Sequence, residues 1–159
     1  MKDIFRLLYS TGVQARFLIK LSSKARKIWI LGKVASILID NWILMLYGLE
    51  VTSSSIHVEN LIIGHSTGVV LGGNGIRCTG TLHLSSGVVF ARRYASSEEA
   101  DPEYFFDIEG DLTIGANSVL LGPLKITGPV IIGALTLVAH DIDEAGTYIG
   151  TPARRLVRN

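Results

Sequence analysis

The chain of 159 residues is 48% hydrophobic and carries a net charge of +1, so its length suggests one domain and its composition allows a large apolar core. It has no dense basic patch interleaved with aromatic residues, which argues against a nucleic-acid-binding role. Cys78 is the only cysteine, which excludes an intrachain disulfide and fits a reducing cytoplasm.

Charge divides the chain into two parts. Residues 1–50, which we predict to form an α-helical head, contain eight basic and three acidic side chains, a net charge of +5; the remainder contains seven and eleven, a net charge of −4. A basic head indicates an anionic partner, although solvated helix faces give the same pattern. No secretory signal is visible at the start, so we expect a cytoplasmic location.

Two helices are predicted in the head. Apolar residues recur at nearly helical spacing over residues 3–22 and 24–48, with a break at Ser22–Ser23, and Gly48 is suited to end the second helix. The stretch 28–49 is strongly apolar, but charged residues interrupt it and no uncharged piece is long enough to span a bilayer. We therefore expect a buried or interfacial helix.

Residues 51–159 are predicted to form a mainly β domain. Branched aliphatic residues recur every six positions, a period that fits neither an α-helix nor a coiled-coil heptad. The main run is Ile108, Ile114, Leu120, Ile126, Ile132 and Val138. A shorter run with the same spacing is Val70, Ile76, Leu82 and Val88. A small residue that permits a tight corner stands two positions after most members of the main run: Gly110, Ala116, Gly122, Gly128 and Ala134.

Such hexads are the signature of a parallel β-helix. Each hexad supplies one side of a triangular coil, and successive coils stack at the spacing of paired strands, about 4.8 Å. The phase slips between His57 and Gly68. The separation of Val88 and Ile108 is not a multiple of six, so residues 92–107 are predicted to leave the coil as a loop. Long loops of this kind are often functional.

Three segments together resemble a known family. Residues 63–70 (Ile-Gly-His-Ser-Thr-Gly-Val-Val) resemble the catalytic-histidine segment of serine O-acetyltransferase-like enzymes, residues 114–119 match an acyltransferase hexad, and residues 150–154 (Gly-Thr-Pro-Ala-Arg) resemble the ending of hexapeptide-repeat acyltransferases. The resemblance implies a left-handed parallel β-helix that forms a homotrimer. It also implies that acetyl-CoA binds in clefts between neighbouring subunits.

The resemblance places the catalytic base at His65. A hydroxyl acceptor must lose a proton as it attacks the thioester carbonyl, and histidine is the side chain best suited to take a proton near neutral pH. A backbone N–H can stabilise the developing oxyanion, and no metal is needed. A histidine at a coil corner without a catalytic task is the alternative.

Donor binding is predicted at the C-terminal coils. By resemblance, Ala116 and Ala134 match positions that line the donor, and Gly115 and Gly133 before them keep the backbone accessible. Arg154 and Arg155 are candidates for binding the phosphates of coenzyme A, because guanidinium suits phosphate well. Ordinary surface charge is the alternative for both arginines.

The acceptor is less clearly indicated. Serine acetyltransferases carry an aspartate before the catalytic histidine, where this chain has Gly64, and a second histidine in the loop before the C-terminal hexads, where this chain has residues 104–107 (Tyr-Phe-Phe-Asp). The Ile-Gly-His form resembles relatives that acetylate sugar hydroxyls during cell-surface polysaccharide synthesis. We therefore expect a sugar acceptor, with free serine as the alternative. A basic head also favours peripheral contact with anionic lipid at the cytoplasmic face of the inner membrane.

Further alternatives stay open. The loop aromatics either wall the acceptor pocket or pin the loop to the next subunit: Tyr94, Tyr104, Phe105 and Phe106. His83 follows His65 by three hexads, so the two could stack on neighbouring coils, as in the γ-class carbonic anhydrases, which bind zinc. Catalytic zinc needs three protein ligands, and we predict no metal site. A non-catalytic assembly module is the remaining candidate.

Overall fold

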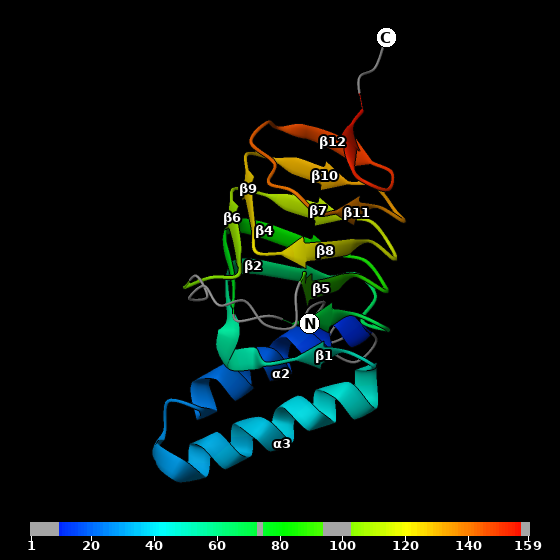
Figure 1. Cartoon of the computed structure of the whole chain (residues 1–159). Helices are drawn as coiled ribbons and strands as arrows, with labels where there is room; N and C mark the ends of the chain where they lie inside the picture. Colours follow the sequence, from blue (N-terminus) through cyan, green and yellow to red (C-terminus); the bar gives the residue numbers. More distant parts are fainter. Residues whose placement is uncertain (1–9, 73–74, 94–102, 157–159) are drawn as a thin grey trace, which may run out of the picture.

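The computed structural model describes residues 10–72, 75–93 and 103–156. Two helices that pack against each other, α2 (Thr11–Ala25) and α3 (Trp29–Tyr47), lie at one end of a stack of short strands (Figure 1). The helical N-terminal segment and the mainly β remainder agree with the prediction from the sequence.

The turn between the helices lies at residues 26–28 and not at Ser22–Ser23, so the predicted break is wrong. Ser22 is fully buried within α2, and its hydroxyl donates a hydrogen bond of 2.7 Å to the carboxylate of Asp40 in α3. A polar residue that resembled a cap therefore joins two helices. Gly48 does end α3, with the left-handed φ of 60° that glycine adopts without steric cost.

Helix α3 is mostly exposed. Its buried residues are Gly32, Ser36 and Ile43. Among the described residues it is the one helix whose length and composition would allow it to cross a membrane, and only 17% of that apolar window is buried. The expectation of a buried helix is therefore wrong for the single chain, and an interfacial position stays a prediction.

The strands form three faces, each a ladder of parallel strands from successive coils. The first face comprises β1 (Glu50–Val51), β3 (Val70–Leu71), β5 (Val89–Arg92), β8 (Val119–Gly122) and β11 (Leu137–Val138). The long strands β2 (Ile56–Ile63) and β4 (Ile76–Leu84) pair with each other and run over the other two faces. The first part of β4 pairs with β6 (Phe106–Glu109) and its last part with β7 (Leu112–Ile114).

The second face continues from β6 to β9 (Leu124–Thr127), and the third continues from β7 through β10 (Val130–Ile132) to β12 (Gly146–Ile149). The antiparallel strand β13 (Arg154–Arg155) closes the third face, and a 3-10 turn, η1 (Ser53–Ser55), links β1 to β2.

Strand register gives the length of a coil. Leu112 pairs with Val130, and Val119 pairs with Leu137, so each partner lies exactly one coil of three hexads further on. The earlier coils contain insertions. Ile56 pairs with Ile76, so the separation of the partners is three hexads plus two inserted residues. The register shifts again between Val58 and Asn60. Leu112, the partner of Leu82, lies five hexads on, because the loop lengthens that coil by the equivalent of two hexads.

The hexad aliphatics form the core. Every member of the main run is at most 1% exposed. Val70 departs from the pattern, because Val69 and Leu71 point inward and Val70 is only half-buried. The insertions in the first coils displace the six-residue phase there. Cys78 is buried.

Phe105 and Phe106 are core residues. They are 3% and 1% exposed, and the ring of Phe106 packs edge-on against Phe90 with centroids 4.9 Å apart. Neither ring is available to line an acceptor pocket or to contact a neighbouring subunit, so both interpretations of these two residues are wrong. Tyr104 is half-buried, and Tyr94 lies outside the described residues.

Candidate functional site

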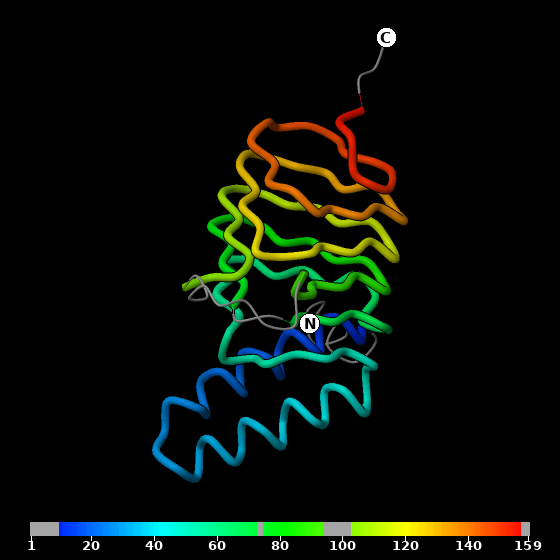
Figure 2. Tube along the Cα trace, in the orientation of Figure 1, coloured from blue at the N-terminus to red at the C-terminus, as the bar shows by residue number. Residues whose placement is uncertain are grey.

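The turns between the third and first faces form one edge of the stack, here named the His65 edge. It comprises residues 64–68, 85–88, 115–118 and 133–136 in successive coils, and the turn from β12 to β13, residues 150–153, stacks on the last of them (Figure 2). Backbone hydrogen bonds connect these turns: Gly64 N–H donates to Leu84 O (2.9 Å), Gly115 N–H to Ile132 O (2.8 Å) and Gly133 N–H to Tyr148 O (2.8 Å). The predicted base and the predicted donor-lining residues therefore occupy the same edge, on different coils.

His65 lies in the first of these turns, between β2 and β3. The backbone around it is fixed from both sides, because Gly68 N–H donates to Gly48 O (2.9 Å) and Gly87 N–H donates to Thr67 O (3.0 Å). Ser66 next to it is buried, whereas the His65 side chain is exposed. A fixed backbone with an accessible imidazole suits a general base that works on a ligand from outside the coil.

His83 does not stack on His65. The insertions shift the register, so that His83 pairs with Ile62. A Cβ built on Gly64 would nevertheless lie 3.6 Å from His83 Nε2. A second imidazole thus stands beside the residue that precedes His65. The spacing of three hexads predicts that His83 stacks on His65. This partner is wrong, because the coil between them is longer than three hexads.

No cluster of three or more His, Cys, Asp or Glu side chains that could hold a metal occurs in the part of the chain that the structure describes.

The glycines of the His65 edge have a packing role. A Cβ on Gly115 would lie 2.5 Å from Ala134 N, and one on Gly133 would lie 2.7 Å from the side chain of Ile149. Both positions need glycine for close stacking of the coils, whether or not a ligand binds. Ala134 is exposed and Ala116 is half-buried, so a ligand that runs along this edge would meet small side chains.

The two C-terminal arginines differ in their contacts. Arg155 forms an ion pair with Glu144 (2.6 Å) and donates a hydrogen bond to Ala145 O (3.1 Å). These partners precede β12, whereas the His65 edge follows β12, so Arg155 is directed away from the predicted donor positions. Arg154 is exposed, and its guanidinium donates to Ala153 O (3.0 Å).

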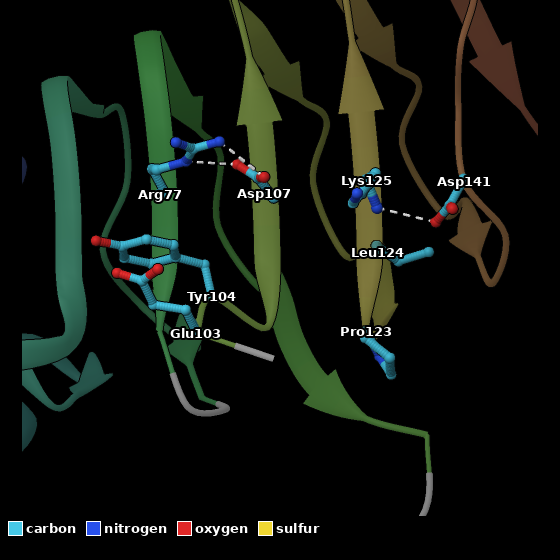
Figure 3. A pocket seen from close by; sticks show the side chains of 8 residues that line it. All are labelled: Arg77, Glu103, Tyr104, Asp107, Pro123, Leu124, Lys125 and Asp141. Carbon is cyan, nitrogen blue, oxygen red and sulfur yellow. Dashed lines mark hydrogen bonds and ion pairs between the residues drawn. The ribbon is translucent and has the colours of Figure 1, made fainter. Parts of the chain in front are cut away.

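A cavity of about 350 Å³ lies elsewhere, over the second face (Figure 3). Arg77 donates two hydrogen bonds to Asp107 (2.6 and 2.8 Å), and this pairing raises the pKa of the Arg77 guanidinium. The guanidinium carbon lies 5.4 Å from the centre of the Tyr104 ring. Asp141 accepts a hydrogen bond from Lys125 N (2.9 Å). No pattern in the sequence points to this cavity, because its polar groups come from strands far apart in the chain.

The structure anchors both ends of the predicted loop. Arg93 donates hydrogen bonds to Leu121 O and Ala139 O, and the guanidinium of Arg92 lies 5.0 Å from the centre of the Phe105 ring. These contacts hold the described loop ends at the edge between the first and second faces. The His65 edge is a different corner of the same coils.

Comparison of sequences finds distant relatives, and no family model matches the chain. A Schizosaccharomyces pombe protein whose name assigns it provisionally to the serine acetyltransferases is 23% identical over 131 residues, which are 82% of this chain and 47% of that protein. The serine acetyltransferase of Bacillus licheniformis is 27% identical over 117 residues, 70% of this chain and 50% of that protein. The chain thus spans about half the length of these relatives.

Comparison of structures finds the same fold in several solved proteins. A serine acetyltransferase from Neisseria gonorrhoeae has a TM-score of 0.76 and 24% identity, covering 96% of this chain and 57% of that one. The soybean enzyme complexed with serine has a TM-score of 0.75 and 20% identity, covering 95% and 59%. A Brucella abortus enzyme in complex with coenzyme A has a TM-score of 0.74 and 19% identity, covering 93% and 56%. These likenesses show the fold.

Proposed function

We propose that the chain is an acetyl-CoA-dependent O-acetyltransferase in which His65 is the general base. The observation that carries the proposal is the His65 edge, which presents an exposed imidazole on one coil and the small residues Ala116 and Ala134 on later coils. The likeness to serine acetyltransferase structures supports it, since one of them was solved with coenzyme A.

The reaction moves one proton from the acceptor hydroxyl to the leaving thiolate through His65. The hydroxyl oxygen of the acceptor attacks the thioester carbonyl while His65 takes its proton, and a bond from oxygen to the acetyl carbon forms. The tetrahedral intermediate then collapses, the carbon–sulfur bond breaks, and the leaving thiolate receives the proton from the imidazolium. Backbone N–H groups near the carbonyl oxygen would stabilise the negative charge that develops there.

The donor would lie along the His65 edge. Ala116 and Ala134 leave room for the pantetheine arm, whose amides can bond to the backbone, and Gly115 and Gly133 keep the coils closely stacked beside it. Arg154 is the better candidate of the two arginines for a phosphate contact, because Arg155 is paired with Glu144.

Serine is the acceptor that the comparisons favour, because the relatives and solved structures found are named serine acetyltransferases. That finding supports the serine alternative better than our expectation of a polysaccharide sugar. The glycine at position 64 is the reason that a sugar acceptor remains the second candidate. A Cβ at this position would meet only ordinary contacts, so packing does not require glycine, and the aspartate of the resembled enzymes is absent.

The proposed working unit is a homotrimer of left-handed parallel β-helices in the cytoplasm. The His65 side chain is exposed in the single chain, and a neighbouring protomer would supply the opposite wall of the donor cleft. A closed cleft would also exclude water from the thioester.

Acetyl transfer by the purified chain tests the proposal. Release of coenzyme A from acetyl-CoA is measured with serine and with a panel of sugars, for wild type, His65→Ala and His140→Ala. The second variant is the matched control, since His140 is also exposed but lies at the edge between the first and second faces. We expect His65→Ala to lower kcat by about 10²–10⁴-fold and His140→Ala to leave it unchanged.

Full transfer by His65→Ala, or a wild type without transfer to any hydroxyl, would overturn the proposal and favour a non-catalytic module. The acceptor with the higher kcat/KM decides between serine and a sugar.

A further inference from the structure

Helix α3 presents an apolar face that nothing in the described chain covers. The residues opposite its buried stripe are each more than half exposed: Ile30, Leu31, Val34, Leu38, Trp42 and Met45. We name this set the α3 apolar face. Leu31 and Met45 are exposed by 85% and 81%, so these side chains stand almost free of protein contacts. Exposed apolar surfaces of this extent mark interaction sites.

The opposite side of α3 is fixed to the protein by polar contacts. The carboxylate of Asp40 accepts hydrogen bonds from the hydroxyls of Ser22 (2.7 Å) and Ser53 (2.5 Å) and from the backbone N–H of Ser53 (3.1 Å). Ser36 and Gly32 are buried on the same side. A transmembrane orientation would break these bonds and expose Asp40 to lipid, so the helix is held parallel to any apolar layer that it meets.

The two helices and the turn between them carry exposed positive charge. Five exposed basic residues lie on the two helices and their connecting turn: Lys20, Lys24, Arg26, Lys27 and Lys33. Within residues 10–50 the acidic residues are Asp40, which is engaged by the two serines, and Glu50. Both tryptophans of the chain, Trp29 and Trp42, lie on α3 and are exposed. Tryptophan is enriched at the boundary between lipid and water.

We propose that the α3 apolar face docks on an anionic lipid surface, with α3 lying in the plane of the interface. An apolar helix face in a helical segment rich in exposed lysine and arginine is the arrangement that binds anionic bilayers. A second copy of the chain is the competing occupant, but two such faces would bring their basic residues together and repel. Charge complementarity therefore favours lipid.

This orientation places the stack of coils on the water side. The helices lie at one end of the stack, and the last described residues lie at the other (Figure 1). His65 belongs to the first coil, which contacts the end of α3 through the hydrogen bond from Gly68 to Gly48. The His65 edge would therefore begin close to the lipid surface and extend away from it.

Intrinsic fluorescence reports docking directly, because every tryptophan of the chain is on α3. The full chain is mixed with vesicles of phosphatidylcholine containing phosphatidylglycerol and, separately, of pure phosphatidylcholine. We expect a blue shift of the emission and quenching by brominated acyl chains with the anionic vesicles. Raised salt should weaken binding, because it screens the attraction.

Two sets of variants separate the apolar and charged contributions. Leu31→Gln combined with Met45→Gln should lose vesicle binding, whereas Ile131→Gln, an exposed apolar residue on β10, should retain it. Lys24→Gln combined with Arg26→Gln and Lys27→Gln should lower the partition coefficient roughly a hundredfold, about fivefold for each basic residue. Lys125→Gln on β9 is the matched control and should have no effect.

Sedimentation velocity without lipid tests whether a second copy of the chain covers the α3 apolar face. If the Leu31/Met45 double variant yields a smaller species than wild type, a second copy covers the face and the lipid proposal fails. Tryptophan emission that does not respond to anionic vesicles also overturns it. Far-ultraviolet circular dichroism checks that the variants keep the wild-type helix and strand content.

Discussion

Single residues decide how the chain turns at the His65 edge. One residue in each of four coils has a positive φ: Gly68 (72°), Gly87 (67°), Asn117 (57°) and Leu135 (58°). In the later coils the sequence pattern predicts the corners at the small residues Ala116 and Ala134. The positive φ instead belongs to Asn117 and Leu135, the residues that follow them. Leucine adopts this conformation with difficulty, so the stacked strands on both sides must impose it on Leu135.

Burial controls the one thiol of the chain. It raises the pKa of Cys78 above its ordinary value of 9.0, because the thiolate would lose its hydration. In the unfolded chain the thiol ionises at its ordinary pKa. The stability that the buried, protonated thiol provides is therefore complete below that pH, and it is lost as the pH rises through the higher pKa of the folded chain.

We therefore expect wild type to lose more unfolding free energy than Cys78→Ala between neutral pH and about one unit above the ordinary thiol value. Urea unfolding at the two pH values measures this difference, and the constant loss from removing the sulfur cancels. Equal alkaline losses in the two proteins would contradict the burial argument.

At the scale of elements, α2 docks on β2 through a close approach at Gly12. A Cβ on this glycine would lie 1.8 Å from the carbonyl oxygen of Ile63, so any other residue must push the helix away from the first coil. Arg16 in the same helix donates a hydrogen bond to Leu61 O (3.1 Å) and would be displaced as well. The contact therefore couples the helical head to the strand that leads into His65.

We predict that Gly12→Ala lowers the free energy of unfolding by about 1–3 kcal/mol, the usual cost of overpacking. Gly64→Ala is the matched control, because its Cβ would meet only ordinary contacts at 3.5 Å and beyond. Urea titrations of both variants give the comparison. A Gly12→Ala protein as stable as Gly64→Ala would show that the helix is not seated as described.

At the scale of the whole molecule, the coil is the unit of construction. Partners in the later coils are three hexads apart on all three faces, as for Phe106 and Leu124, Leu112 and Val130, and Val119 and Leu137. Each coil contacts mainly its neighbours, so a whole coil can be removed while the remaining contacts keep their register.

Deletion of residues 115–132 should therefore leave a folded chain, because Ile114 is then followed by Gly133 in place of the equivalent Gly115. Deletion of residues 115–131 shifts every later inward residue by one position and should abolish the cooperative transition. Circular dichroism with urea unfolding compares the two. Equal behaviour of both deletions would refute a fixed coil of three hexads.

The sequence alone determined the coil. Aliphatic residues at six-residue spacing predict inward positions because each side of a coil buries one such residue, and from Ile108 to Val138 all six are buried. The same spacing placed Ala116 and Ala134, three hexads apart, at one corner of successive coils. His65 was assigned by the resemblance of residues 63–70, and only the structure puts it on the same edge. Where residues are inserted, as before Val70 and His83, the spacing misplaced the side chains.

Only the tertiary structure decided which groups from distant coils meet. The Arg77–Asp107 pair, the burial of Phe106 and the polar contacts of Asp40 depend on register across insertions or on packing between helices, and neither follows from local periodicity. The same holds for the α3 apolar face. A helix that is apolar around most of its circumference does not reveal which side will pack, and here Ser22 and Ser53 select it by binding Asp40.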